Sequence, residues 1–140
     1  TALDHCERLE PLRVADVCTG SGCVAVALAR EFTRATITAS DLVPDALVVA
    51  ARNVERHGVS ARVRLVVADL FDGVGGPFDL IAVNPPYVPL TDAPGLEPEV
   101  REFEPATALF AGPDGLQVIR RLVLEAPASL ARHGLLMFEF

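Results

Sequence analysis

The sequence predicts an α/β fold with a doubly wound, mainly parallel sheet. Short apolar segments rich in β-branched residues alternate along the chain with longer segments of helical character. Strands that alternate with helices in this way pair in parallel through crossover helices. The 140 residues suffice for one domain with its own core, and 51% hydrophobic residues is ordinary for a globular protein.

The first half of the chain contains two strand–helix pairs. Residues 13–18 form a short apolar run that ends in a glycine-containing turn, so we expect a buried strand there. Residues 23–32 are rich in Ala and predict a helix. Residues 35–40 predict the second strand, and residues 44–58 the second helix, because a proline opens this segment and a glycine closes it.

The second half contains three more strands and one long helix. We expect the third strand at residues 62–68 and the fourth at 78–83. A helix is predicted over residues 115–134, with a kink or a restart at Pro127. Residues 135–140 then predict the fifth strand.

Residues 84–114 interrupt the alternation of strands and helices. Seven of the eleven prolines lie in this stretch, and a short helical turn is expected near residues 98–103. A loop of this length inside a compact domain is usually a binding or lid element, or else disordered. In doubly wound sheets, ligands bind beyond the carboxyl ends of the strands, where this loop begins.

Charge and composition exclude several classes of protein. The net charge is −7, and the basic residues do not cluster, so a surface that follows nucleic-acid phosphates is not supported. No apolar run approaches the 18 residues typical of a membrane span, and the first ten residues are too charged for a signal peptide. The three cysteines, Cys6, Cys18 and Cys23, lack metal-site spacing and indicate reduced thiols in a cytosolic protein.

A glycine-rich turn follows the first predicted strand. In "DVCTGSG" (residues 16–22), Gly20 and Gly22 allow a tight turn and a close approach of ligand to backbone. The helix that follows offers free N–H groups to a carboxylate or a phosphate. A plain tight turn is the alternative. The segment "GSGCVA" also matches the dinucleotide fingerprint, which leaves a nicotinamide dehydrogenase open as a rival.

Two aspartates stand at the ends of the next two strands. Asp41 lies 19 residues after Gly22, where a carboxylate can accept hydrogen bonds from both hydroxyls of a ribose; its alternative role is a helix cap. Asp69 could accept the amino group of an adenine, with Leu70 and Phe71 near the ring face. A solvated loop acid is an equally good interpretation of Asp69.

The segment "NPPY" (residues 84–87) decides between the rival cofactors. Its prolines end the fourth strand, because they cannot donate hydrogen bonds to a neighbouring strand. The side-chain oxygen of Asn84 and the carbonyl of Pro85 can then accept hydrogen bonds from a planar NH₂ group, and Tyr87 can pack on its flat face. Hydride transfer has no use for such a clamp, whereas methylation of an amide or amino nitrogen does.

Four segments in this order and spacing carry a family resemblance: "ADVCTGSG", "ASDLVPDAL", "ADLF" and "NPPYVP". Together they resemble the S-adenosylmethionine-dependent methyltransferases that modify planar nitrogens. The further run "EPATALFAGPDGL" is similar to the protein-(glutamine-N5) methyltransferases of the HemK/PrmC type. The resemblance covers nearly the whole chain, although "NPPY" alone is shared with adenine-N6 DNA methyltransferases.

The resemblance implies a Rossmann-like class I methyltransferase fold, S-adenosyl-L-methionine as cofactor and no metal. It assigns the cofactor site to Thr19, Gly20, Ser21, Gly22, Asp41, Leu42, Asp69, Leu70 and Asn84. It assigns the catalytic site to Asn84, Pro85 and Tyr87, with substrate contacts from the loop around residues 104–105. The implied reaction is methylation of a glutamine side-chain nitrogen in the Gly-Gly-Gln motif of peptide-chain release factors, in the cytoplasm.

The chain departs from the family pattern in two ways. The family usually has glycine where Cys18 stands, which we expect to tighten the cofactor site. Its members also carry an N-terminal helical domain and two further strands, so residues 1–140 are expected to be a partial catalytic domain. An adenine-N6 nucleic-acid methyltransferase, a methyltransferase for a ribosomal-protein glutamine and a non-catalytic cofactor-binding fragment remain as alternatives.

Overall fold

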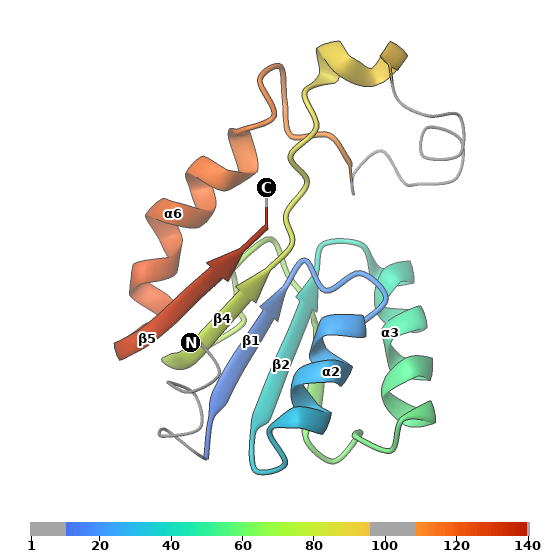
Figure 1. The fold of residues 1–140 in the computed structure, drawn as a ribbon, viewed down its shortest axis with the longest axis vertical. Coiled ribbons are helices and arrows are strands. Elements are labelled where there is room, and N and C mark those ends of the chain that lie inside the picture. The colour runs from blue at the N-terminus through green and yellow to red at the C-terminus, as the bar shows by residue number, and fades with distance from the viewer. Residues whose placement is uncertain (1–10, 96–108, 140) are drawn as a thin grey trace.

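A computed structural model describes residues 11–95 and 109–139. These residues form a five-stranded parallel sheet with helices on both faces (Figure 1). In chain order the elements are β1 (Arg13–Val17), α2 (Cys23–Glu31), β2 (Thr36–Asp41), α3 (Pro44–Arg56), β3 (Val63–Val67), β4 (Phe78–Val83), the 3-10 helix η1 (Leu90–Gly95), α6 (Gln117–Ser129) and β5 (Leu130–Phe138). The predicted doubly wound parallel sheet is confirmed.

The order of the strands creates a switch point in the middle of the sheet. Neighbouring strands follow the order β3-β2-β1-β4-β5, so the chain builds outward from β1 on one side and then crosses to β4 on the other. The carboxyl ends of the strands face one edge, and the segment after β4 rises beyond that edge (Figure 1). Parallel sheets bind ligands at such a switch point.

The sheet is buried on both faces by two separate hydrophobic clusters. One cluster joins Val14 and Ile37 of the sheet to the α2 and α3 side, where Ala29 and Val54 pack. The other joins the opposite face of the sheet to α6, where Leu122 is fully buried. Because neighbouring residues of a strand point to opposite faces, burial of both faces requires nearly continuous apolar strands. This is the pattern that made the strands recognisable.

The predicted helix over residues 115–134 is wrong at its end. Helix α6 ends at Ser129, and the chain enters β5 directly at Leu130. Pro127, in the last turn, lacks the N–H that would continue the helical hydrogen bonds. Leu130 then pairs with Phe78 of β4, and an irregularity in the register follows this pair. Pairing with a central strand therefore outweighs the helical propensity of the residues after 129.

Two segments of the proline-rich region lie side by side above the sheet. The N–H of Val88 donates to the carbonyl of Leu109 at 2.8 Å, and the N–H of Ala111 donates back to Val88 at 3.1 Å. The N–H of Leu90 donates to the carbonyl of Gly112 at 3.0 Å. The sequence did not predict this pairing or η1. The helical turn expected near residues 98–103 lies outside the described residues.

Within residues 11–95 and 109–139, no helix combines the length and the apolarity needed to cross a membrane. In the same part of the chain, no three His, Cys, Asp or Glu side chains come together in a group that could hold a metal ion.

Candidate functional site

A cavity of about 830 Å³ opens at the carboxyl ends of the strands. This volume lies in the range of small-molecule and cofactor sites. Seven of the predicted site residues line it: Gly20, Ser21, Asp41, Leu42, Asp69, Leu70 and Asn84. Four predicted residues do not line it: Thr19, Gly22, Pro85 and Tyr87. The structure thus brings the ends of β2, β3 and β4 and the glycine-rich turn to one place.

The two glycines of the turn serve different purposes. Gly20 has a φ of +55°, and a Cβ added there would meet no atom within 4 Å, so its backbone faces open space at the cavity. Gly22 has a φ of +77°, and a Cβ there would lie 3.0 Å from the Cβ of Ala50 in α3. Gly20 therefore leaves room for a ligand, whereas Gly22 allows the start of α2 to pack against α3.

Asp41 fastens the glycine-rich turn to the end of β2. Its Oδ2 accepts a hydrogen bond from the N–H of Gly20 at 2.8 Å, and its Oδ1 accepts one from the N–H of Val43 at 2.9 Å. Val43, rather than Asp41, is the N-cap residue of α3. Each carboxylate oxygen keeps a further lone pair. The carboxylate is thus held in place and can still accept hydrogen bonds from a ligand.

A second carboxylate, that of Asp16, is buried next to the glycine-rich turn, with the residue only 2% exposed. Its Oδ2 accepts hydrogen bonds from the hydroxyl of Thr19 and, at 2.9 Å, from the N–H of Ala25 in α2. Thr19 is therefore a structural residue of the turn that the cavity does not touch. Burial, with a smaller contribution from the nearby Asp41, raises the pKa of Asp16 to about 6 against the opposing effect of these two hydrogen bonds.

Stability is expected to depend on pH through Asp16. Its carboxyl keeps a proton up to about pH 6 in the folded state, but only to about 3.8 when unfolded. Between these values the folded state binds more protons, so the contribution of Asp16 is greatest below pH 3.8 and is lost as the pH rises through 6. A difference of this size corresponds to about 3 kcal/mol.

The measurement is the free energy of unfolding in urea between pH 4 and 7, compared for the wild type and Asp16→Asn. The difference between the two proteins isolates Asp16 from the other carboxyl groups. We expect the free energy of unfolding of Asp16→Asn to decline less than that of the wild type as the pH rises from 4 to 7. An identical pH dependence in both proteins would show that Asp16 ionises normally in the folded state.

Cys18 lines the same cavity in a backbone conformation that suits glycine. Its φ is +58°, in the left-handed region where a Cβ is strained. A glycine would adopt this backbone conformation without strain. Burial, with smaller contributions from the carboxylates of Asp41, Asp16 and Asp69, raises the pKa of the Cys18 thiol to about 12. The thiol therefore stays protonated near neutral pH and is a poor nucleophile there.

The end of β3 turns sharply into the cavity. Leu70 has a φ of +50°, is 4% exposed and lines the cavity together with Asp69. Phe71, expected near the face of a bound ring, instead packs against the core cluster on the α6 side. The Asp69 carboxylate is exposed and is contacted by Arg121 of α6.

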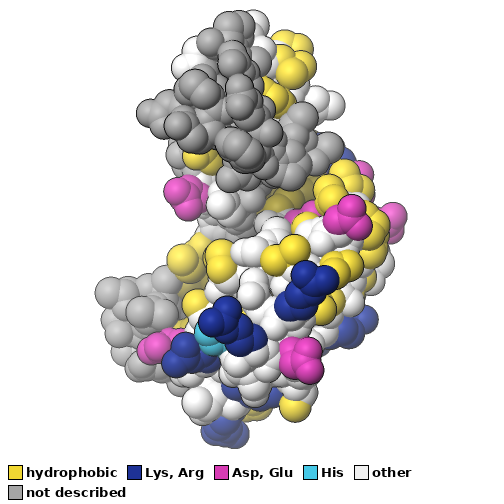
Figure 2. Space-filling view, turned by 90° about the vertical axis from the view of Figure 1, so that its right-hand side faces the viewer, with side chains coloured by type: hydrophobic (Ala, Val, Ile, Leu, Met, Phe, Trp, Pro, Cys, Tyr) yellow, Lys and Arg dark blue, Asp and Glu magenta, His cyan; other side chains and the backbone are white. Residues whose placement is uncertain are grey.

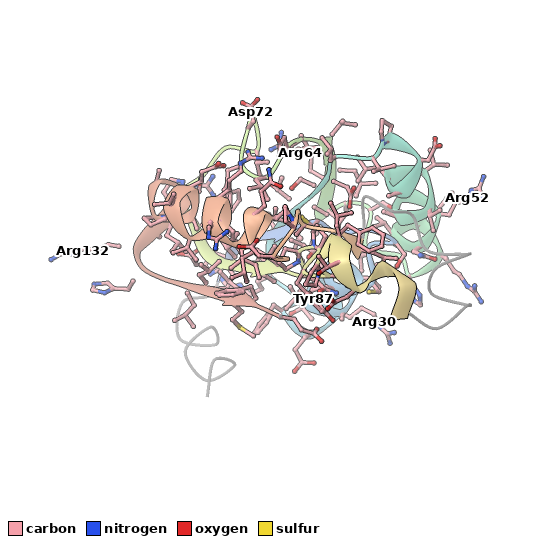
Figure 3. The ribbon with its side chains drawn as sticks, turned by 90° about the horizontal axis from the view of Figure 1, so that it is seen from above. Arg30, Arg52, Arg64, Asp72, Tyr87 and Arg132 are labelled. Carbon is pink, nitrogen blue, oxygen red and sulfur yellow. The ribbon has the colours of Figure 1, made fainter. Side chains whose placement is uncertain are left out.

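The "NPPY" segment places its residues in different environments. Asn84 is exposed and lines the cavity, and its carboxamide makes no hydrogen bond to the part of the chain that the structure describes. The side chain of Pro85 is fully buried, and Pro86 is the proline that lines the cavity. Tyr87 is 43% exposed and, seen from above, lies near the middle of the molecule (Figure 3). The predicted Glu104–Pro105 contact lies outside the described residues.

Sequence reasoning missed part of the cavity wall. The missed residues are Val43, Asp45, Ala46, Val49, Ala68, Pro86, Phe110, Val118 and Arg121. The missed residues between 43 and 49 follow Asp41 closely in the sequence. The position of Asp41 at the end of a strand was therefore a signal that could have identified them. Phe110, Val118 and Arg121 come from a distant part of the chain, and no local pattern indicates that they return to β3.

The charges around the cavity are mostly negative. Asp41, Asp45 and Asp69 line it, against the single guanidinium of Arg121 among its described lining residues. On the face seen in Figure 2, acidic side chains lie at mid-height and lower down, and most arginines lie in the lower half. In the view from above, Arg30, Arg52 and Arg132 point outward at the periphery (Figure 3). A cavity with this potential favours a ligand that carries positive charge.

Comparisons with known proteins agree with this geometry. Residues 3–93 match the methyltransferase small domain family. The chain is 47% identical, over 131 residues, to the release factor glutamine methyltransferase of Chlorobaculum tepidum, covering 90% of this chain and 44% of that protein. It is 45% identical to the ribosomal protein uL3 glutamine methyltransferase of Francisella tularensis, covering 90% of this chain and 40% of that protein.

The fold also resembles solved methyltransferases. The crystal structure of a ribosomal protein L11 methylase from Lactobacillus delbrueckii superimposes with a TM-score of 0.66 at 24% identity, covering 98% of this chain and 56% of that one. The chain spans less than half of the length of the two glutamine methyltransferases above. The family match covers more than half of the chain, from before β1 to beyond the "NPPY" segment. The chain therefore belongs to the methyltransferase small domain family.

Proposed function

We propose that this chain binds S-adenosylmethionine and methylates the side-chain nitrogen of a protein glutamine. The single observation that carries the proposal is the position of Asn84. Its carboxamide has no hydrogen-bond partner among the described residues, and it lines the same cavity as Gly20 and Asp41. An acceptor for a planar NH₂ group therefore stands beside a site suited to a nucleoside.

The residues around the cavity fit this cofactor. The open space at Gly20 accommodates the methionine part, and the fixed carboxylate of Asp41 offers lone pairs to the ribose hydroxyls. Asp69 and Leu70, at the end of β3, would receive the adenine. When bound, S-adenosylmethionine supplies an electrophilic methyl group on a positively charged sulfur. The acidic lining favours such a cation.

The chemistry of glutamine methylation requires positioning more than acid–base catalysis. An amide nitrogen is a weak nucleophile, because its lone pair is delocalised into the carbonyl. We infer that the side-chain oxygen of Asn84 and the backbone carbonyl of Pro85, whose side chain is buried, accept hydrogen bonds from its two N–H groups and so hold the nitrogen in place. Holding the reacting atoms in line then supplies most of the rate enhancement. An alkylated amide nitrogen that still carries two protons is strongly acidic, so water can accept one of them.

The nature of the substrate is supported by the relatives and by the "EPATALFAGPDGL" segment. Relatives near 45% identity are named as release factor glutamine methyltransferases, and others as uL3 glutamine methyltransferases. We propose the glutamine of the Gly-Gly-Gln motif of a release factor as the substrate. We also infer that residues 1–140 belong to the catalytic domain of an enzyme that acts in the cytoplasm.

Two measurements test the proposal. Calorimetric titration is expected to show binding of S-adenosylmethionine and no binding of a nicotinamide dinucleotide. Mass spectrometry is then expected to show one added methyl group on the Gly-Gly-Gln glutamine of a release factor. Methylation of uL3 instead would change the assigned substrate, and methylation of adenine in DNA would overturn the protein-glutamine assignment. Cofactor binding without any methyl transfer would identify a non-catalytic chain.

A further inference from the structure

Arg121 joins two elements that are far apart in the sequence. From α6, its Nη1 lies 3.0 Å from Oδ1 and 3.1 Å from Oδ2 of Asp69, which follows β3. Both residues line the cavity. Val118, one turn earlier on α6, lines it as well, so this face of the helix forms a wall beside the end of β3.

The guanidinium of Arg121 also contacts a second carboxylate, that of Glu125. Its Nε donates to Oε1 of Glu125 at 3.1 Å, one turn further along α6. The hydrogen bonds to Asp69 and then to Glu125 raise the pKa of Arg121, so its charge is permanent. Contacts with these two carboxylates thus restrict the direction in which the guanidinium points.

This ion pair contributes little to the stability of the fold. The side chains of Arg121 and Asp69 are 44% and 50% exposed, and exposed pairs of this kind stabilise proteins only weakly. Its effect is on geometry. One nitrogen nearly equidistant from the two oxygens fixes the direction in which the carboxylate points and leaves lone pairs free on both oxygens. A ligand that fills the cavity would cover the pair and strengthen it by excluding water.

We propose that Arg121 is a positioning residue for the nucleobase. It orients the Asp69 carboxylate to accept a hydrogen bond from the amino group of a 6-aminopurine. The cavity thereby discriminates against a 6-oxopurine, whose oxygen would face the carboxylate without a proton between them. This inference rests on the proposed function, because the purine belongs to the cofactor assigned there.

The test compares binding of S-adenosylhomocysteine and S-inosylhomocysteine by calorimetry. Arg121→Met keeps an unbranched, flexible side chain and removes the charge and the hydrogen-bond donors. We expect this variant to bind the adenosyl compound about tenfold more weakly, which is the loss expected for one charge-assisted hydrogen bond. The ratio of the two affinities is expected to fall about tenfold in the variant, because an unoriented Asp69 no longer distinguishes amino from oxo groups.

Arg120 provides a matched control on the same helix. It pairs with Asp114 at 2.7 Å, is also exposed and does not line the cavity. We expect Arg120→Met to leave both affinities within about twofold of the wild type. Arg121→Lys, which keeps the charge but not the planar fork, is expected to restore part of the affinity and part of the discrimination.

The outcomes separate this inference from the proposed function. The positioning role is refuted if the wild type binds S-adenosylhomocysteine and Arg121→Met has the same affinity for it and the same preference for it over S-inosylhomocysteine. If the wild type binds neither compound, the proposed cofactor itself is wrong. Urea unfolding of each variant shows whether it is folded. If Arg121→Met does not fold, the more conservative Arg121→Lys is compared with the wild type in the same way. Discrimination lost in Arg121→Met and kept in Arg120→Met supports the assignment.

Discussion

Asn84→Ala is expected to lower the rate of methyl transfer by at least about 100-fold, while cofactor affinity changes by less than about threefold. Its side chain lies at the mouth of the cavity and makes no hydrogen bond to the described residues, so its removal disturbs no contact of the fold there. The loss falls on the orientation of the substrate amide. Steady-state rates and calorimetric binding of S-adenosylhomocysteine measure the two quantities separately.

Asn53→Ala is the matched control for Asn84. The Asn53 side chain, from α3, donates to the carbonyl of Ser21 in the glycine-rich turn at 2.9 Å. Its removal is expected to weaken cofactor binding by a few-fold through that turn, the reverse of the Asn84 result. Cofactor binding lost in Asn84→Ala with the protein still folded would show that Asn84 holds the cofactor rather than the substrate.

Gly115→Ala is expected to lower the rate of methyl transfer by about 100-fold and the free energy of unfolding by about 2–4 kcal/mol. Gly115 is buried, has a φ of +72°, and a Cβ there would overlap the carbonyl oxygen of Tyr87 and lie 3.0 Å from Cδ of Pro89. These are backbone and ring atoms that cannot turn aside. The "NPPY" segment must therefore move away from residue 115, and Asn84 moves with it.

Gly73→Ala is the control that introduces backbone strain without any steric overlap. Gly73 has nearly the same φ, +71°, but no atom lies within 4 Å of a Cβ added there. Its alanine variant is expected to lose only about 1 kcal/mol of stability and none of the activity. If Gly115→Ala behaves like Gly73→Ala in both urea unfolding and turnover, the packing of residue 115 against Tyr87 does not position the catalytic segment.

Much of the fold and part of the cavity followed from local patterns. The alternation of strands and helices, the glycine-rich turn and the acids at strand ends are written in short segments, and parallel pairing brings strand ends together. Gly20, Asp41, Asp69 and Asn84 line one cavity for this reason. The end of α6 was placed wrongly, because the helix yields to pairing of Leu130 with β4.

The residues that the sequence could not place are those that depend on contacts across the chain. Arg121 meets Asp69 over 52 positions, and Val88 pairs with the segment around Phe110. Neither contact leaves a periodic signal, because each involves one or two side chains or backbone groups rather than a repeated face.

The sequence by itself therefore determined the class of fold, the edge of the sheet where the cavity lies and the family to which the chain is similar. Local preferences of backbone and side chain decide these features residue by residue. Only the tertiary structure decided that Thr19 and Gly22 support the turn from outside the cavity and that α6 closes its wall. It also decided that Gly115 packs against the "NPPY" segment. The physical reason is that steric exclusion and ion pairing act through space, so they are set only when the whole sheet has assembled.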